Sequence, residues 1–497
     1  MQTTKKPPYG IIGILLIGAF ISLLNETLLN IALPSIKNEL GVTTSTVQWL
    51  TTGYMLVNGI MIPTTAFLIQ RYSVRGLFLT AMALFTTGTV VAGVAPEFGV
   101  LLAARVIQAS GAAIMMPLLM NVLLTSFPIE KRGGAMGIFG LVMIFAPAIG
   151  PTLSGWLIEH YDWRMLFHVV TPIAFVVLVL AFFLLKDQKE KVDIQLDKLS
   201  LILSVFGFGG LLYGFSSAGD KGWGSLEVYG TIIVGVIGLV LFITRQFKLE
   251  KPMLEFRIFK YPMFALSSAI SIVITMALFS AMLLLPMYVQ SARGISPLDS
   301  GLLLLPGALV MGIMSPITGK LFDKFGARVL AVIGLAITGI TTYMFSQLSL
   351  TTTYTELIIL YTARMFGMSM VMMPIMTNGL NQLPQQFNPH GTAMNNTLQQ
   401  VSGAIGSALL VTVMSNRTEF HAEELTKEAM SNGAVAPTAD LQQQIGLQAM
   451  VEGINDSFLI SSILIVVALV LSLFMKRVTV SGVTQDQQAV KREQFAK

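Results

Sequence analysis

Three charged residues lie inside long apolar stretches of the sequence: Glu26, Arg105 and Arg364. An isolated charge is costly there unless it is paired or hydrated. Glu26 is therefore predicted to bind and release a proton, the alternative being a structural acid satisfied by Asn30 or by a neighbouring helix. Arg105 keeps its proton in proteins and is predicted to hydrogen-bond polar groups or carbonyls, with Gln108 one turn along sharing its network. Arg364 has no such Gln and is predicted to snorkel outward or to bond carbonyls.

The composition identifies the environment of these residues. Of 497 residues, 54% are hydrophobic and 11% are charged, and the mean hydropathy is +0.73. Soluble domains carry about 25% charged residues, so a soluble globular protein, a disordered chain and a DNA-binding protein are excluded. The chain has no Cys, and its four His residues lie far apart, so we expect no disulfide, thiol nucleophile or metal site. Without a GxxxxGK[ST] loop, nucleotide hydrolysis is not expected either, and we expect no cofactor.

The apolar segments predict an all-α polytopic membrane protein, because a helix crosses a bilayer with about 20 mostly apolar residues. The first segment is followed by a polar turn and indicates a retained span, not a cleaved signal peptide. The predicted spans are 10–33, 46–69, 77–95, 99–123, 135–158, 166–185, 199–217, 228–244, 263–290, 299–319, 327–347, 356–378, 391–415 and 457–475.

The Lys and Arg residues predict the orientation of these spans. With the N-terminus inside, 23 of the 31 fall in cytoplasmic segments, six in external segments and two within spans. This bias indicates a multi-pass protein of the cell membrane with both termini cytoplasmic. The net charge of +5 is then explained by topology and contacts with membrane lipids, and no nucleic acid partner is expected.

The two ends of the chain echo each other. Arg105 and Arg364 are each followed by a Met-Met-Pro triplet, in the fourth and twelfth spans. Such internal repeats are typical of secondary transporters, whose substrate site lies near the midplane between the repeats. The predicted organisation is an N-terminal six-helix bundle (1–185), a cytoplasmic linker (186–198), two inserted helices with a basic loop (199–262), a C-terminal six-helix bundle (263–475) with a long external loop (416–456, of which 417–431 is a candidate surface helix), and a cytoplasmic tail (476–497).

Several motifs occur in order along the spans. They are Leu24–Pro34 (LNETLLNIALP) in the first span, Arg105, Gln108 and Gly111 in the fourth, Ala146–Trp156 (APAIGPTLSGW) in the fifth, and Gly319–Arg328 (GKLFDKFGAR) after the tenth. In these motifs the sequence resembles the major facilitator superfamily, specifically its fourteen-span drug:proton antiporter branch of QacA- and EmrB-type exporters. The resemblance covers about residues 10–475.

The resemblance implies two six-helix bundles plus two extra helices, and a proton-coupling role for Arg105 together with Glu26 and Gln108. It implies no catalytic residue. The fifth span, with the motif residues Pro147, Gly150, Pro151 and Gly155, is expected to form an antiporter hinge and seal. The alternative is a bend that is needed only for packing. A cytoplasmic gate is expected from Arg71, Arg75, Gly319, Asp323, Lys324, Gly326 and Arg328.

Two departures from the family pattern matter. Gln70 stands where the first copy of the loop motif usually has Asp, and Ser73 where it has Gly, so the charge network of that copy is in doubt. In the first span the usual acid falls at Asn25, with Glu26 one place later. Either the proton carrier has moved by about 100° around the helix, or Glu26 has another role.

The residues expected to line a substrate cavity are amides, aromatic residues and methionines. Flexible, polarizable methionines suit binders of many shapes, although they also fill ordinary helix contacts. The Met residues cluster at 115–120 and 365–376. With a single membrane-embedded acid, the lining favours an uncharged or zwitterionic solute. The named candidates are Asn25, Asn30, Trp49, Tyr54, Asn58, Met116, Asn121, Met372, Asn378, Asn395 and Gln399.

The sequence thus predicts a monomeric porter that exports amphipathic, drug-like small molecules by alternating access, driven by the proton gradient through Glu26. A porter of the same fold for a lipid, fatty acid or endogenous metabolite is the main alternative. A membrane-embedded enzyme is disfavoured because paired carboxylates, His clusters and a Ser/His pair are missing from the spans. A non-transporting sensor would be supported only by the external loop.

Overall fold

The computed structural model describes residues 9–186, 196–431 and 439–477, and within these ranges a few side chains, among them those of Asn30 and Pro151, are not described. All regular elements in the described ranges are helices. Fourteen spans in those ranges are long and apolar enough to cross a membrane, and they correspond one for one to the predicted spans. The predicted all-α polytopic fold is confirmed.

The first bundle is built from six helices that pack on one another, with α3 against α4 and α6, and α1 against α4, α5 and α6. Ser73 accepts a hydrogen bond from the Gly76 N–H at 3.1 Å and so caps the start of α3, which explains a Ser at this point of the loop motif. The elements are α1 (Tyr9–Leu40), α2 (Thr44–Arg71), α3 (Val74–Gly93), α4 (Phe98–Ser126), η1 (Ile129–Lys131), α5 (Arg132–His160) and α6 (Met165–Leu184).

The second bundle contains two irregular spans. The predicted span 356–378 is interrupted at Met370 and Val371, which separate α12 from α13, and the ninth span ends in a π-helical turn, η3. Such breaks are common at functional positions. The elements are η2 (Phe256–Lys260), α9 (Pro262–Met287), η3 (Tyr288–Ala292), α10 (Pro297–Phe325), α11 (Ala327–Phe345), α12 (Tyr354–Ser369), α13 (Met372–Gln382), η4 (Gln385–Phe387), α14 (Asn388–Ser431) and α15 (Ala439–Ser472).

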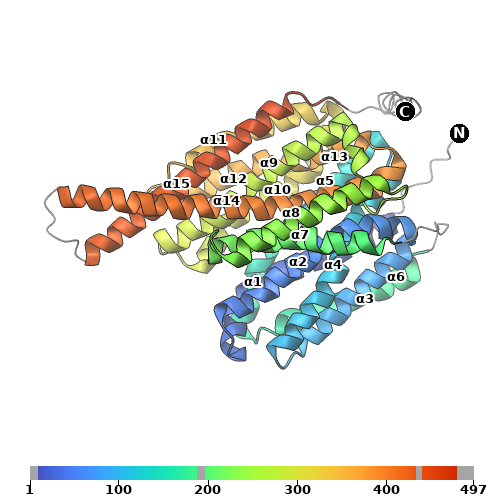
Figure 1. Ribbon diagram of the computed structural model, residues 1–497, viewed down its shortest axis with the longest axis horizontal. Helices are drawn as coiled ribbons and strands as arrows, with labels where there is room; N and C mark the ends of the chain where they lie inside the picture. The colour runs from blue at the N-terminus through green and yellow to red at the C-terminus, as the bar shows by residue number, and fades with distance from the viewer. Residues whose placement is uncertain (1–8, 187–195, 432–438, 478–497) are drawn as a thin grey trace.

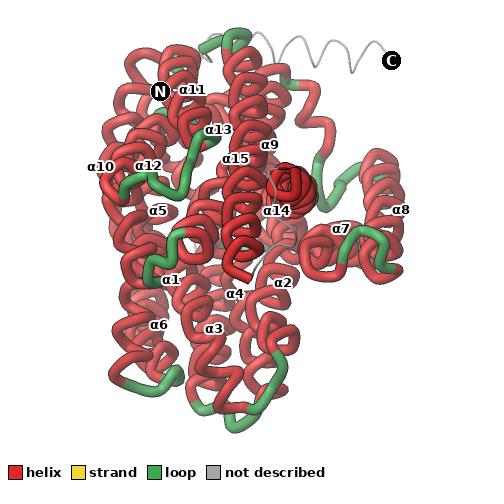
Figure 2. The backbone as a smooth tube through the Cα atoms, turned by 90° about the vertical axis from the view of Figure 1, so that its left-hand side faces the viewer, coloured by secondary structure: helices red, strands yellow, loops and turns green. Residues whose placement is uncertain are grey.

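The inserted pair, α7 (Lys198–Lys221) and α8 (Leu226–Lys248), forms a hairpin beside the two bundles (Figure 2). Glycines let these helices approach closely: a Cβ on Gly238 would lie 2.8 Å from the backbone nitrogen of Gly207. The main contacts of this pair with α2 and α14 come from α7, and α8 lies on its outer side. The hairpin therefore covers the α2–α14 side of the molecule.

The longest helices, α14 and α15, extend well beyond the other spans as an antiparallel hairpin (Figure 1). The 44 residues of α14 measure about 66 Å at 1.5 Å per residue, roughly twice the apolar thickness of a bilayer. The segment 416–456, expected to be a loop, is helical in its described residues: 416–431 continues α14, in agreement with the candidate helix 417–431, and 439–456 belongs to α15. Below, the apical face is the side from which this hairpin protrudes, and the basal face is the side where α1 begins and α15 ends.

The two bundles meet along α5 and α10 on one side and along α14 with α2 and α4 on the other. Glycine permits the first contact: a Cβ on Gly137 would lie 2.6 Å from the Ser315 carbonyl oxygen, and a Cβ on Gly319 would collide with the backbone of Gly133. The small residues thus permit the close approach of α5 to α10.

Candidate functional site

Arg105 is the centre of a buried polar network in the first bundle. Its side chain, on α4, is 0% exposed, and one guanidinium nitrogen donates to Asn25 Oδ1 on α1 at 2.9 Å and to Gln108 Oε1 at 2.6 Å. Another donates to the Leu50 carbonyl on α2 at 3.3 Å. The guanidinium also lies 4.0 Å from the centre of the Tyr54 ring. These neutral partners let a cation remain buried without an ion pair.

Gln108 extends this network to a fourth helix. Its Nε2 donates to Thr89 Oγ1 on α3 at 2.7 Å, and the Thr89 hydroxyl donates in turn to the Phe85 carbonyl at 2.7 Å. Gln108 and Thr89 are both 0% exposed. The predicted pairing of Gln108 with Arg105 is thus present, and it orients the guanidinium towards α1.

Glu26 lies beside this network without being part of its hydrogen bonds. It follows Asn25 on α1, is half-buried, and is electrostatically coupled to Arg105 and Tyr54. Within the described residues it has no ion pair within 4.0 Å. The suggested contact with Asn30 falls on a side chain outside the described residues. Glu26 is therefore an acid close to a buried cation, and none of the described hydrogen bonds of Arg105 involves its carboxylate.

Arg364 holds the corresponding place in the second bundle and is satisfied differently. It is 0% exposed, so the expected snorkelling is wrong, whereas the alternative of carbonyl bonding is correct. Its Nε donates to Thr342 Oγ1 at 3.0 Å and another nitrogen donates to the Ala277 carbonyl at 3.0 Å. No acid comparable with Glu26 lies next to it among the described residues, where Tyr361 is its electrostatic neighbour.

The helix α5 contacts α1 close to Glu26. Ser154 Oγ donates to the Leu28 carbonyl at 2.6 Å, and a Cβ on Gly150 would collide with the Thr27 hydroxyl. Gly150 therefore permits close packing of α5 on α1, which is compatible both with the expected hinge and seal and with the packing alternative. Gly155 is not needed for such packing, because a Cβ there would meet no atom within 4 Å, and the side chain of Pro151 lies outside the described residues.

A cavity of about 480 Å³ lies between α5 and the second bundle. The second methionine cluster lines it, whereas the first, with Met116, packs in the α4 core. Pro147 of the antiporter motif also contributes. None of the described lining residues is charged, and the residues are Phe139, Gly140, Met143, Ile144, Pro147, Ala148, Thr152, Leu278, Met282, Pro286, Gln290, Ser300, Gly301, Leu304, Leu305, Ala308, Met311, Ser315, Tyr361, Met365, Met368, Ser369, Met372, Met373, Met376 and Gln399.

Of the predicted cavity residues with described side chains, Met372 and Gln399 line this cavity and the others do not. Most of the amides instead satisfy groups inside the protein, as Asn25 does at Arg105. Asn378 donates to the Lys476 carbonyl at 3.1 Å, and Asn395 Nδ2 donates to Met376 Sδ at 2.7 Å. Of the two aromatic candidates, Tyr54 lies against the Arg105 guanidinium and Trp49 stacks on Tyr213 of α7. Asn121 is buried in α4, and Asn58 is half-buried on α2.

Several lining residues were not predicted, among them Gln290, Tyr361 and the serines at 300, 315 and 369. No sequence signal marked them, because the span 356–378 has the composition of one continuous helix; the structure shows α12 ending at Ser369, itself a lining residue, and α13 beginning at Met372. The π-helical turn η3 similarly carries Gln290 at the apical end of α9. A membrane protein tolerates irregular backbone where it lines a cavity. Facing lipid, the same backbone would leave N–H and C=O groups without hydrogen-bond partners.

At the basal face, the intact loop motif joins the two bundles. The Asp323 carboxylate, on α10, accepts hydrogen bonds from the Gly133 and Gly134 N–H groups at 2.8 and 2.9 Å, at the start of α5. A carboxylate is favoured there by the helix dipole. Arg132 adds a bond to Asn381 Oδ1 on α13 at 3.1 Å. These contacts hold the basal ends of α5, α10 and α13 together.

The remaining predicted gate residues have separate places. Arg71 lies over the Phe67 and Tyr72 rings, and Arg75 donates to the Phe182 carbonyl at 3.0 Å; these contacts lie within the first bundle. Gln70 Nε2 lies 2.7 Å from His390 Nε2 on α14. An amide–imidazole contact therefore occurs where the loop motif usually has an Asp. Lys324 lies over the Phe325 ring, Arg328 is exposed, and Gly326 needs its positive φ of 81° to end α10.

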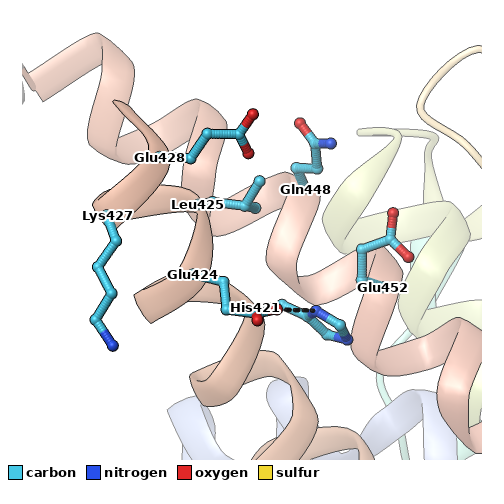
Figure 3. A pocket seen from close by; sticks show the side chains of 7 residues that line it. All are labelled: His421, Glu424, Leu425, Lys427, Glu428, Gln448 and Glu452. Atoms are coloured by element: carbon cyan, nitrogen blue, oxygen red, sulfur yellow. Dashed lines mark ion pairs between the residues drawn. The ribbon is translucent and has the colours of Figure 1, made fainter. Parts of the chain in front are cut away.

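A second hollow, of about 490 Å³, lies on the apical hairpin and differs in kind (Figure 3). Its lining is mostly charged or polar, including His421, Glu424, Glu428 and Glu452. His421 Nε2 is 2.9 Å from Asp456, which also accepts from Arg417 at 2.5 Å. No group of acids and histidines suited to a metal ion occurs in the described part of the chain. These ion pairs fasten the two long helices together.

Comparison with known proteins gives a consistent result. A family model described as Major Facilitator Superfamily matches residues 15–407. The uncharacterized MFS-type transporter YhcA of Bacillus subtilis is 49% identical over 96% of this chain and 94% of its own. The lincomycin resistance protein LmrB of Bacillus subtilis is 44% identical over 97% and 99%. The crystal structure of the human organic anion transporter MFSD10 (TETRAN) shares the fold with a TM-score of 0.63 and 12% identity, over 93% of this chain and 100% of that one.

Proposed function

The chain belongs to the major facilitator superfamily of transporters and is not an enzyme, and on this premise we propose that it is a proton-coupled antiporter that exports amphipathic, drug-like molecules. It is a multi-pass membrane protein with fourteen spans. We infer from the distribution of Lys and Arg that the basal face is cytoplasmic and that the protein lies in the cell membrane.

The observation that carries the proton-coupling proposal is the position of Glu26. Asp299 and Glu356 lie in the first turns of α10 and α12, whereas Glu26 lies deep within α1, beside the buried Arg105. Protonation of Glu26 removes a negative charge that faces Arg105, so the two states of the acid favour different arrangements of α1. Arg105 and Gln108 keep the cation in place through both states.

The basal contacts and the cavity support alternating access. Asp323, Arg132 and Gln70 join the two bundles on the basal side, while the cavity reaches Gln290 and Ser300 near the apical ends of their helices. We infer that this conformation faces outward. Opening to the cytoplasm then requires the Asp323 bonds to Gly133 and Gly134 to break.

The substrate class is supported by the cavity and by a relative. Methionines adapt to many shapes, and the described lining is apolar with a few hydroxyl and amide groups. LmrB of Bacillus subtilis is named as a lincomycin resistance protein. An amphipathic solute such as lincomycin is therefore the first compound to test.

The purified protein in proteoliposomes provides the test, with an imposed pH gradient and a substrate panel of lincomycin, a neutral amphipathic dye, a fatty acid and a phospholipid. We expect gradient-driven movement of lincomycin or the dye that stops when a protonophore collapses the gradient. Movement of the fatty acid or phospholipid alone would replace the drug-exporter proposal by the lipid-porter alternative. Gradient-independent movement of every compound would contradict proton coupling.

A further inference from the structure

We propose that the substrate and the proton occupy separate sites, and that the methionine-lined cavity takes an uncharged amphipathic molecule which never contacts Glu26. This inference rests on the proposed function and specifies its binding site. Neither Glu26 nor Arg105 lines the cavity, and no described lining residue is charged. The acid and its cation belong to α1 and α4, whereas the cavity belongs to α5 and the second bundle.

The chemistry of the cavity defines the ligand class. Ser300 and Ser315 both line it and lie fifteen residues apart on α10, so the cavity extends over roughly 22 Å of that helix. Gln290 near the apical end and Gln399 deeper inside provide neutral donors and acceptors, and methionines cover much of the wall. A neutral molecule with an apolar body and amide or hydroxyl groups is matched by these partners. A permanent cation would lose its water without gaining a counter-charge.

The helix α5 connects the two sites. Phe139, Met143 and Pro147 face the cavity, while Gly150 and Ser154 contact Thr27 and Leu28, the residues that follow Glu26 closely on α1. A shift of α1 on protonation is thus transmitted to the cavity wall without contact between proton site and ligand. Because coupling between sites is reciprocal, substrate binding must alter proton affinity by the same factor.

The separate-site proposal predicts how binding depends on ligand charge. The probes are a neutral benzophenone carboxamide and the same scaffold carrying a trimethylammonium group, bound to the full-length purified protein and cross-linked by light. The extent of labelling against probe concentration gives each affinity, and peptide mass spectrometry locates the label. We expect saturable labelling within 365–376 by the neutral probe and at least about tenfold weaker binding of the cation, equivalent to 1.4 kcal/mol.

Two variants decide between separate and shared sites. Glu26→Gln should change the affinities of both probes by the same factor, so that their ratio stays within about twofold, because its effect reaches the cavity only through conformation. Gln399→Glu should shift the ratio at least about tenfold towards the cation, since it places an acid of nearly the same shape in the cavity. Gln347→Glu, the same change on the exposed apical surface, is the matched control and should leave the ratio unchanged.

The outcomes separate this inference from the proposed function. Selective loss of cation binding in Glu26→Gln, or preferred binding of the cation by the wild type, would show that Glu26 shares the substrate site. Absence of saturable label in 365–376 would also overturn the inference. If the binding results hold while no proton-driven flux is found, the site assignment stands and the antiporter proposal fails.

Discussion

Arg105 and Arg364 hold matching places in the two bundles, and both are fully buried, yet their surroundings differ. Arg105 donates to two side-chain amides and a carbonyl from three helices and has Glu26 beside it. Arg364 donates to a hydroxyl and a carbonyl, with no neighbouring acid among the described residues. The repeat has therefore kept a buried cation twice, but among the described residues only Arg105 has an acid beside it, and the apolar cavity lies between α5 and the second bundle.

The largest effect is expected from Arg105→Lys. Lysine keeps the charge, but its compact ammonium cannot reach Asn25, Gln108 and the Leu50 carbonyl together. We expect gradient-driven flux to fall by more than about 30-fold, a loss of about 2 kcal/mol in coupling, with the protein still folded. Flux in proteoliposomes and elution as a single species in gel filtration check this. Wild-type flux in the Lys variant would show that transport needs only the positive charge of Arg105 and not its hydrogen bonds.

Gln108→Leu should have an intermediate effect. The change removes one of two amide partners of Arg105 and leaves the Thr89 hydroxyl without its donor, while keeping the helix and its volume. We expect about a tenfold loss of flux, because one buried charge-assisted hydrogen bond is lost. Gln347→Leu on the exposed apical surface is the matched control for the amide change and should leave flux in proteoliposomes unchanged.

Arg364→Lys should have a smaller effect on transport than Arg105→Lys. The partners of Arg364 are a single hydroxyl and a backbone carbonyl, and no proton carrier depends on them. We expect flux within about threefold of the wild type and a lower thermal unfolding temperature in detergent, since the ammonium satisfies the buried site less well. Equal losses of flux in the two Lys variants would remove the functional difference between the bundles.

The smallest effect on transport is expected at an ion pair in the inserted hairpin, because this hairpin carries neither the proposed proton site nor the described cavity lining. Hydrogen bonding from Arg245 lowers the pKa of Asp197 to about 2, and Asp197 also caps α7 through Ser200. The ionised carboxylate therefore adds stability above its ordinary value of 3.8, which is lost as the pH falls towards 2. Because both side chains of the pair remain partly exposed to solvent, Asp197→Asn should cost at most about 1 kcal/mol.

Thermal unfolding in detergent at neutral pH and between pH 4 and 2 measures this cost. The difference between wild type and Asp197→Asn should shrink across the acid range, and transport should be unaffected. A large loss of flux would instead give the inserted hairpin a direct part in coupling.

The sequence predicted the spans and the buried charges because both depend on local composition. Apolar runs of sufficient length mark spans, and charges such as Arg105 within them must find partners. The pairing with Gln108 followed from their spacing on one helix. The apical hairpin was predicted only in part: 417–431 was a candidate helix, whereas 439–456 was expected to be loop because only membrane-length apolar runs were counted.

The cavity could be predicted only in part because the direction of a side chain depends on helix packing. Asn25, Asn378 and Asn395 were expected to bind a solute, but each satisfies a group of the protein itself. The same uncertainty applies to the two methionine clusters, which look alike in sequence. Met372 faces the cavity and Met116 the core around α4, a difference that follows from the rotation of each helix within its bundle.

The most direct test of the central claim is the proton movement that accompanies substrate exchange. A pH-sensitive dye inside proteoliposomes would report the lumenal pH after addition of the best substrate of the panel, for wild type, Glu26→Gln and the exposed-acid control Glu419→Gln. We expect a substrate-dependent pH change in the wild type and the control, and none in Glu26→Gln. A wild-type pH change in Glu26→Gln would contradict the assignment of Glu26 as the proton carrier.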